Sequence, residues 1–363
     1  MSEEKLVPKL RFSGFKNSWD TYKLKDLLKN KSSNISINQL DENIGEYPLY
    51  GAGGFLKSID FYEMDCDYIS IVKDGSGVGN ISFHEKNSSI VNTSQYLLPK
   101  DNIDINFIFY LLQTINLDKY KTGSTIPHIY FKDYSIEKVH IPKLDEQSRI
   151  GFLFKNIDLK IKILEKKYQS YIDFKKYLMQ QIFTQKLRFD FKDEWKITKL
   201  GEITKINTGN KDVKDKIDNG KYPFFVRSEK VERINSYSFD GEAILIPGDG
   251  KIGEVYHYIN GKFDYHQRVY KISDFKNNIN GKYIYYYLEK NFLKQALKNS
   301  AKATVDSLRM DTLTKMPIEL PSFEEQVEIV DILSLADEKI GLIEKNIKIS
   351  KHFKRGLLQQ MFV

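Results

Sequence analysis

The sequence IPKLDEQSRI at residues 141–150 returns as LPSFEEQVEI at residues 320–329, 179 residues further along the chain. Both copies place a proline four residues before a Glu-Gln pair. The spacing continues without a gap, so that QQIF at residues 180–183 matches QQMF at residues 359–362. A repeat much longer than a solenoid period indicates two copies of a whole domain with its helix. Two copies of one binding device favour a target with two halves.

The segments that precede these copies repeat more loosely. The sequence LRF at residues 10–12, followed by Trp19, matches LRF at residues 187–189, followed by Trp195. Between these landmarks and the prolines, the loops differ in length and content. The helical parts are therefore near copies, whereas the globular parts share a frame and differ in their surface. This pattern predicts a symmetric pair of helices that carries two different binding domains.

A helix of about 40 residues is expected after each proline, and a helix of that length is roughly 60 Å long. Stripe positions recur at alternating steps of four and three residues, which is the seam of a coiled coil. Acidic residues after Pro142 and Pro321 suit a helix first turn. The expected helix–helix and partner interface consists of Ile157, Ile161, Leu164, Tyr168, Leu178 and Ile182 in the first copy and Ile340, Ile343, Ile347, Leu357 and Met361 in the second.

Two lysines, Lys175 and Lys354, interrupt the seam at equivalent positions. A polar residue in a seam can specify register and partner at some cost in stability. Antiparallel helices would let the two ends of the second globular segment lie close together, as domain termini usually do. We therefore expect an α+β fold in which two pseudo-symmetric domains are joined by two long antiparallel coiled-coil helices. The expected boundaries are 1–141 and 187–319 for the domains, and 142–186 and 320–363 for the helices.

The composition fits a globular protein, and its moderate positive charge fits either a polyanion partner or simply a Lys-rich, Asn-rich chain. The 363 residues can hold two full cores, and Lys plus Arg exceed Asp plus Glu by 56 to 49, giving a net charge of +7. Cys66 is the single cysteine, which excludes an intramolecular disulfide and disfavours a cysteine zinc site. The sequence has no membrane-length apolar run and no signal-peptide core near Met1, so a cytoplasmic protein is expected.

Each globular part contains a strand, a glycine-rich turn and a second strand, which is typical of a hairpin. A helix is expected after each hairpin, at residues 106–117 and 281–298. The turns cover residues 73–79 and 247–253. No lysine that follows a glycine is followed by Ser or Thr, and neither turn opens a helix, so the Walker and dinucleotide motifs are excluded. Glycines that provide positive φ in a turn are the simpler account. Lys73, Ser76 and Lys251 could still contact DNA phosphate.

A second matched loop precedes each proline, at residues 121–130 and 300–309. It is polar, and it diverges between the copies inside a shared frame, which is where we expect sequence to be read. A solvated loop is the alternative for any single residue, because most protein–DNA hydrogen bonds only position the protein. Arg268 and Arg309 are the best single candidates, since arginine most commonly pairs with guanine. Arg268 lies in the second globular part outside these loops. The other candidates, all within the loops, are Lys121, Ser124, Thr125, His128, Tyr130, Lys302, Thr304 and Ser307.

The sequence offers no catalytic or metal site. The six histidines show no metal-ligand spacing. An adenine methyltransferase would carry adjacent prolines, and none of the nine prolines is adjacent to another. Asp/Glu-x-Lys triplets such as 158–160 lie on the expected helices, where they are interpreted as solvated faces. We expect no catalytic residue, no metal and no cofactor bound by this chain.

The tandem architecture, the Pro-x-x-Asp/Glu-Glu-Gln start and the Gln-Gln-Ile/Met-Phe end of each helix resemble the DNA specificity subunit of type I restriction-modification systems. The resemblance covers essentially the whole chain. It implies two target-recognition domains, each reading half of a bipartite site in double-stranded DNA, with helices that set the spacer and dock methyltransferase subunits. It also implies a non-catalytic chain whose partners, two methyltransferase subunits and restriction subunits, carry S-adenosylmethionine, ATP and Mg²⁺.

Two other classes of function stay open at the level of sequence. A coiled-coil scaffold that does not touch DNA would show the same heptads, because heptads indicate only that helices pack. A self-sufficient enzyme with a degenerate site is a further alternative. A gel shift with and without a methyltransferase partner would separate the DNA-reading protein from the scaffold.

Overall fold

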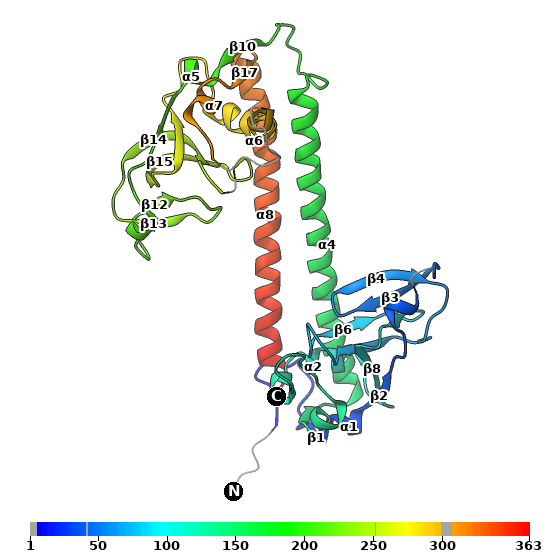
Figure 1. Ribbon diagram of the computed structural model, residues 1–363. Coiled ribbons are helices and arrows are strands. Elements are labelled where there is room, and N and C mark those ends of the chain that lie inside the picture. The colour runs from blue at the N-terminus through cyan, green and yellow to red at the C-terminus, as the bar shows by residue number, and fades with distance from the viewer. Residues whose placement is uncertain (1–5, 41–42, 251, 299–306) are drawn as a thin grey trace. The chain divides into compact units, whose positions relative to one another are not determined.

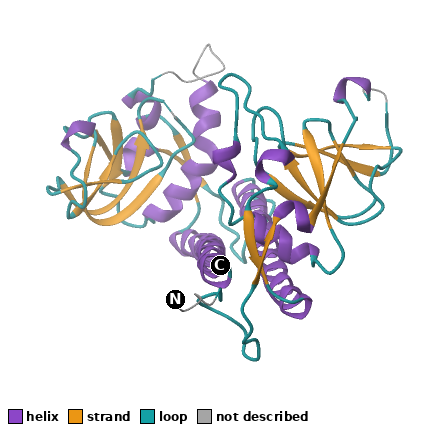
Figure 2. Ribbon diagram, turned by 90° about the horizontal axis from the view of Figure 1, so that it is seen from below, coloured by secondary structure: helices purple, strands orange, loops and turns teal. Residues whose placement is uncertain are grey.

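The structure is a computed structural model that describes residues 6–40, 43–250, 252–298 and 307–363. The chain divides into two compact units (Figure 1). Unit 1 is the described part of Met1–Lys166 together with Glu344–Val363, and unit 2 is the described part of Lys167–Ile343. Both units combine strands with helices (Figure 2), and each takes one part of each long helix, α4 (Leu144–Phe183) and α8 (Phe323–Met361).

Unit 1 contains three small sheets. Strands β1 (Asp20–Lys23) and β9 (Lys138–Ile141) form an antiparallel pair that brings the two ends of the globular segment together. The four-stranded sheet has the order β2 (Leu28–Ser32), β8 (Ser94–Pro99), β5 (Tyr68–Val72) and β6 (Ile81–His84), and the three-stranded sheet has the order β4 (Gly54–Ile59), β3 (Tyr47–Gly51) and β7 (Ser89–Ile90). The short helices are α1 (Leu24–Leu27), η1 (Ile37–Gln39), α2 (Ile105–Leu112), η2 (Leu117–Tyr120) and α3 (Phe131–Tyr134).

The core of unit 1 joins this globular part to the long helices. Every residue of β5 is buried, and α2 packs on the same core as Phe154 of α4. Asp104 caps α2 by accepting a hydrogen bond from the Phe107 backbone N–H at 2.8 Å. Gly151 of α4 makes this contact possible, because a Cβ there would lie only 2.7 Å from Asp104 Oδ1.

Unit 2 contains an antiparallel pair of strands and one larger sheet. The pair is β10 (Lys196–Lys199) with β17 (Pro317–Leu320), which corresponds to β1 with β9 in unit 1. The six-stranded sheet has the order β11 (Lys205–Thr208), β16 (Val269–Ser273), β14 (Phe239–Pro247), β15 (His257–Tyr265), β12 (Tyr222–Phe225) and β13 (Glu232–Ile234). The short helices are α5 (Leu200–Ile203), η3 (Val213–Asp215) and α7 (Met310–Thr314), and the longer α6 (Gly281–Lys298) packs on the core with α4 and α8.

The two hairpins expected from the glycine-rich turns are confirmed. Strand β5 pairs with β6, with Tyr68 opposite His84, and β14 pairs with β15, with Leu245 opposite His257. The helix expected at 281–298 is α6. The helix expected at 106–117 ends earlier, at Leu112. Asn116 accepts a hydrogen bond from the Asp118 N–H at 3.1 Å and so starts the separate turn η2.

Within each unit, α4 and α8 run antiparallel. In unit 1, Asp158 pairs with Lys354 at 2.7 Å and Glu165 with Lys351 at 2.7 Å. Residue numbers therefore rise along α4 in the direction in which they fall along α8. In unit 2, Leu178 and Ile182 of α4 share a core with Leu333 and Ile329 of α8. The α+β fold class, with two similar halves and long antiparallel helices, is therefore confirmed.

The seam lysines sit in two matching clusters. In the Lys354 cluster of unit 1, Lys354 pairs with Asp158 at 2.7 Å, and the Tyr110 hydroxyl donates to Asp158 at 2.7 Å. The ammonium also lies 5.0 Å from the Tyr110 ring centroid. Each cluster thus ties the two long helices to a helix of the globular part.

The Lys175 cluster of unit 2 repeats this arrangement with Asp337 at 2.9 Å and Tyr286, whose hydroxyl donates to Asp337 at 2.7 Å. It adds a second acid, since Lys175 also pairs with Glu289 at 3.0 Å. Burial raises the pKa of Glu289, and Lys175 opposes that rise. The lysine that completes each unit comes from the other sequence copy.

The Glu-Gln pair that opens each long helix is buried in both units. Glu146 accepts two hydrogen bonds from Arg11, at 2.6 and 2.7 Å, and Glu325 accepts two from Arg188, at 3.0 and 2.7 Å. These bidentate contacts explain why the LRF motif and the Glu-Gln motif repeat together.

The glutamines fasten the globular parts to the helices. Gln147 accepts a hydrogen bond from the Asp104 N–H at 3.0 Å and donates to the Pro142 carbonyl at 2.9 Å. Gln326 does the same with Asn280 at 2.9 Å and Pro321 at 3.1 Å. In the described part of the chain, no helix is both long enough and apolar enough to cross a membrane.

Candidate nucleic-acid interface

In unit 1 the two polar loops singled out in the sequence lie against each other. The turn that follows β5 contacts the segment 121–130 through two backbone hydrogen bonds. Ile129 N–H donates to the Lys73 carbonyl at 2.9 Å, and Gly75 N–H donates to the Pro127 carbonyl at 3.0 Å. The positive φ of Gly75, 81°, allows the turn to fold back in this way. Two segments about 50 residues apart in sequence thus form one surface.

Asp74 and His128 join these loops through their side chains. Nδ1 of His128 lies 2.7 Å from Asp74 Oδ1, and both side chains are about one-third exposed. The His128 ring stacks on Tyr130 with centroids 6.3 Å apart. A histidine fixed by a carboxylate at one nitrogen presents its other nitrogen in a defined direction.

The structure brings the other predicted residues of unit 1 to the same two loops. Lys73 is half-buried, and its ammonium lies 3.9 Å from Asp74. Lys121 pairs with Asp118 at 2.6 Å in an exposed contact of the kind that contributes little to stability. Ser76, Ser124, Thr125 and Tyr130 are exposed.

Unit 2 builds the same meeting of loops with different side chains. Leu308 N–H donates to the Gly248 carbonyl at 2.8 Å, as Ile129 does to Lys73 in unit 1. The backbone of Asp249 forms an isolated antiparallel β-bridge with that of Ser307, as Asp74 does with His128. Asp74 and Asp249 therefore occupy equivalent places, one in each unit.

Two arginines contact Asp249. Nη1 of Arg268 donates to Oδ2 at 2.9 Å, and Nη1 of Arg227 lies 3.2 and 3.3 Å from the two carboxylate oxygens. Burial would raise the pKa of Asp249, but the hydrogen bonds from Arg268 and Arg227 hold it below its ordinary value. The carboxylate is 18% exposed, whereas Arg268 is 65% and Arg227 45% exposed.

Asp249 and Arg268 line an open hollow of about 390 Å³ in unit 2. Hydroxyl and amide groups lie around the charged side chains, which suits hydrogen bonding to a polar ligand. The lining residues are Thr208, Gly248, Asp249, Gln267, Arg268, Tyr270, Ser307 and Leu308. Predicted Arg268 and Ser307 thus come together here. Arg309 is exposed at the start of α7, and Lys251, Lys302 and Thr304 lie outside the described residues.

Sequence reasoning missed the two aspartates and Arg227. An available signal was the Asp-Gly pair that follows a buried strand in both copies, 74–75 and 249–250. Arg227 carried no such signal, because it reaches Asp249 from the chain after β12 only once the sheet has formed.

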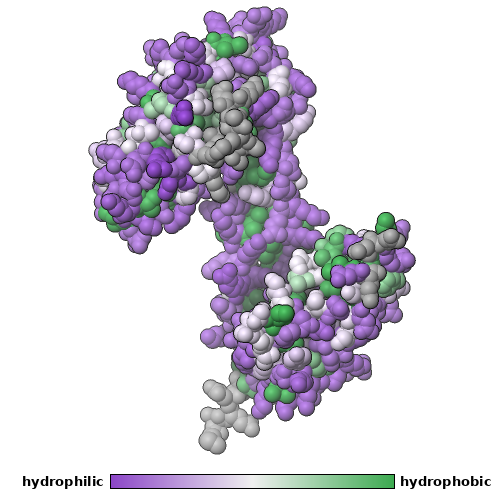
Figure 3. All heavy atoms as spheres, in the orientation of Figure 1, coloured by the Kyte–Doolittle hydropathy of each residue, from purple (hydrophilic) through white to green (hydrophobic). Residues whose placement is uncertain are grey.

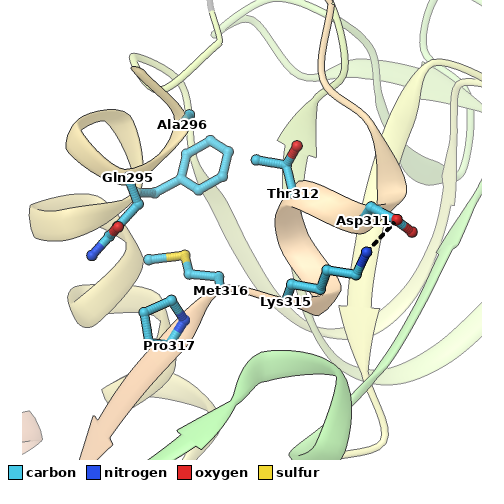
Figure 4. A pocket seen from close by; sticks show the side chains of 8 residues that line it. Gln295, Ala296, Asp311, Thr312, Lys315, Met316 and Pro317 are labelled. Carbon is cyan, nitrogen blue, oxygen red and sulfur yellow. Dashed lines mark hydrogen bonds and ion pairs between the residues drawn. The ribbon is translucent and has the colours of Figure 1, made fainter. Parts of the chain in front are cut away.

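A second hollow of unit 2 lies between α6 and α7 and has a different character (Figure 4). Its volume is about 180 Å³, and Phe292, Met316 and Pro317 contribute apolar lining. Its charged side chains, Asp311 and Lys315, pair with each other at 2.8 Å. No candidate for DNA contact lines it, and the described residues contain no group of three or more His, Cys, Asp or Glu that could hold a metal ion.

All of the predicted interface residues of the long helices are buried or half-buried. The core of unit 1 contains Ile157, Ile161, Leu357 and Met361, and the core of unit 2 contains Leu178 and Ile182. Ile343 is also buried. The half-buried residues are Leu164, Tyr168, Ile340 and Ile347.

A second set of apolar side chains on the long helices is exposed. The exposed members include Phe152 at 70%, Phe353 at 56%, Leu335 at 64% and Leu342 at 58%. Figure 3 shows scattered apolar patches within a mainly hydrophilic surface.

Comparison with known proteins identifies relatives for both halves. The chain matches the family model of the type I restriction modification DNA specificity domain twice, at residues 16–170 and 192–350. It is 32% identical over 169 residues to the type I restriction enzyme EcoDI specificity subunit of Escherichia coli, a match over 46% of this chain and 37% of that protein. This match thus spans little more than a third of the relative's length.

A longer match is to the type I restriction enzyme MjaVIII specificity subunit of Methanocaldococcus jannaschii. The two are 26% identical over 380 residues, covering 90% of this chain and 88% of that protein. Among solved structures, the type I restriction-modification S subunit from M. genitalium has the same fold, with a TM-score of 0.76 at 18% identity over 98% of this chain and 99% of that one.

Proposed function

Because the chain belongs to the family of type I restriction modification DNA specificity domains, we propose that it is the sequence-specific DNA-binding subunit of such a system. Each globular part reads one half of a bipartite site in double-stranded DNA. The observation that carries this proposal is the pair of equivalent loop junctions. Asp74 holds a histidine in unit 1, and Asp249 holds two arginines in unit 2. Equivalent frames with different hydrogen-bonding groups are what two half-sites of different sequence require.

The long helices contribute the spacer and the partner contacts in this proposal. Their inner stripe is used for helix packing, whereas large apolar side chains such as Phe152, Phe353 and Leu335 face outward. These exposed apolar side chains are available for contacts with other proteins. We assign these outer faces to two methyltransferase subunits, with restriction subunits completing the complex.

The chemistry of the complex lies on its partners in this proposal. This chain has a positioning role and no catalytic residue, while S-adenosylmethionine, ATP and Mg²⁺ bind the methyltransferase and restriction subunits. The complex acts in the cytoplasm, where these cofactors meet the DNA of a prokaryotic cell. No observation on the described residues favours the coiled-coil scaffold over this function.

Exchange of one globular part tests whether each part recognises its own half-site independently. Residues 21–140 are replaced by the matching domain of a specificity subunit with a different target, and methylated adenines are mapped in cells that supply the methyltransferase subunits. One half of the recognised site should change, and the other half and the spacer should stay the same. A change in both halves would contradict independent reading by the two units. Reciprocal exchange of residues 200–315 is the matched control and should alter the opposite half.

A further inference from the structure

Asp249 and Arg268 are connected through the backbone as well as through their side chains. Gly248 N–H donates to the Arg268 carbonyl at 2.8 Å, and Arg268 N–H donates to Nδ1 of His266 at 2.9 Å. Nη1 of the same arginine lies 2.9 Å from Asp249 Oδ2. Arg268 is therefore held at both ends, and less rotamer entropy remains to be lost when it binds a ligand.

The guanidinium keeps donors for a ligand. Among the described residues, the hydrogen bonds of the Arg268 side chain involve Nη1 alone, and the side chain is 65% exposed. A guanidinium presents its N–H groups as a planar fork, which matches a pair of acceptors. In the major groove, guanine offers such a pair in O6 and N7.

Charge distinguishes a base edge from a phosphate as the ligand. A phosphate at this position would meet the Asp249 carboxylate as well as the two arginines, and like charges repel at short range. The guanine edge is neutral, and the amino group of its paired cytosine can donate to a carboxylate. Asp249 offsets one of the two arginine charges and so weakens the attraction for a phosphate, while the mixed acceptor and donors match the edge of a G·C pair.

Unit 1 offers a contrast at the equivalent place. Asp74 contacts Nδ1 of His128, which leaves a single ring nitrogen for a ligand in place of a fork. The two junctions therefore cannot make the same contact with DNA. On the premise of the proposed function, we propose that Arg268 reads a guanine in one half-site and that Asp249 is the positioning residue that aims it.

The test uses the complete complex with its methyltransferase subunits. The target is first established by mapping methylated adenines, and binding is then measured on duplexes in which each base pair of the target is replaced in turn. The variants are Arg268→Lys, which keeps the charge and removes the fork, and Asp249→Asn, which removes the carboxylate charge and keeps its shape. Lys315→Ala is the control, because it removes an exposed cation of the same unit that does not line the hollow of Asp249 and Arg268.

Arg268→Lys should lower the preference for one G·C pair in one half-site by about 5- to 150-fold, the effect of one bidentate base contact. The salt dependence of binding and the other half-site should not change. Asp249→Asn should relax the same base pair, and Lys315→Ala should leave the preference intact. Circular dichroism of each variant reports whether the fold is retained.

Three outcomes would overturn the inference. Weakening that is uniform across sequences, with a salt slope reduced by about one, would identify Arg268 as a phosphate contact. An unchanged preference in Arg268→Lys, or a wild-type half-site without guanine, would remove its role in reading. The proposed function fails separately, if the wild-type complex shows no bipartite preference at all.

Discussion

Buried polar side chains, Glu146 and Gln147 in unit 1 and their counterparts in unit 2, hold each globular part to its long helix. An acid in the first turn of a helix is ordinarily a surface residue that interacts with the helix dipole. Here Glu146 is 1% exposed, and Arg11 neutralises it with two hydrogen bonds. Removing one partner of such a buried pair leaves an uncompensated charge, which is costly. The repeated motif is thus a structural fastening.

His84 makes the stability of unit 1 dependent on pH. It is 7% exposed and contacts Ser70 Oγ at 2.8 Å, and burial lowers its pKa from 6.5 to about 4. Between these values the unfolded chain binds the proton more readily, so stability falls as pH decreases from about 6.5 to about 4. The contribution lost is up to about 3 kcal/mol.

The check is the free energy of unfolding at pH 7 and pH 4.5 for the wild type and for His84→Gln. The variant should lose the part of the acid sensitivity that His84 contributes. Equal slopes of stability against pH in the two proteins would show that His84 is not responsible.

At the scale of elements, sequence-based prediction succeeded where the signal is local. The long helices, the two hairpins and α6 follow from periodicity and glycine-rich turns within a few residues. The junction of loops could not be predicted in the same way. Asp74 and His128 are 54 residues apart, and Asp249 and Arg227 are 22 residues apart on different parts of the sheet. Such contacts depend on how elements assemble, which a single sequence does not reveal without an alignment.

The Lys354 cluster is expected to stabilise the contact between α4 and α8 in unit 1. Lys354→Met leaves Asp158 partly buried without its cation and should cost about 1–2 kcal/mol, between the values for exposed and buried pairs. Chemical denaturation measures this loss.

An apolar replacement of the whole cluster separates charge from shape. Lys354→Met combined with Asp158→Leu and Tyr110→Phe should recover most of the lost stability, because no unpaired polar group remains. Lys351→Ala, which removes an exposed pair between the same helices, is the control and should change stability by less than about 0.5 kcal/mol. A triple variant as unstable as the single one would contradict this account.

At the scale of the whole molecule, the long helices are the segments common to both units. Residues 144–166 of α4 belong to unit 1 and residues 167–183 to unit 2, and α8 is divided likewise. The Lys354 and Lys175 clusters lie on either side of these divisions. Each unit can therefore keep its own helix register if the helices are lengthened between the clusters.

Insertion of one heptad after Lys166 and another after Lys345 tests the role of the helices as a ruler. The insertion adds about 10 Å to each helix, which is close to three base pairs of B-DNA. The spacer between the methylated half-sites should lengthen while both half-sites keep their sequence. Mapping of methylated adenines gives the result. An unchanged spacer would contradict the idea that the helices set its length. An insertion into one helix alone is the control, and it should disrupt the packing of α4 against α8.

The exchange of lysines between the two copies also bears on the evolutionary origin of the chain. Lys175 and Asp158 both belong to the first copy, yet each finds its partner in the second. A chain with one copy alone would carry both the lysine and the aspartate, and two identical chains could form both ion pairs between them. The present gene then looks like the tandem fusion of a self-pairing ancestor. After such a fusion, the loops can diverge freely while selection on the exchanged groups keeps the two halves compatible.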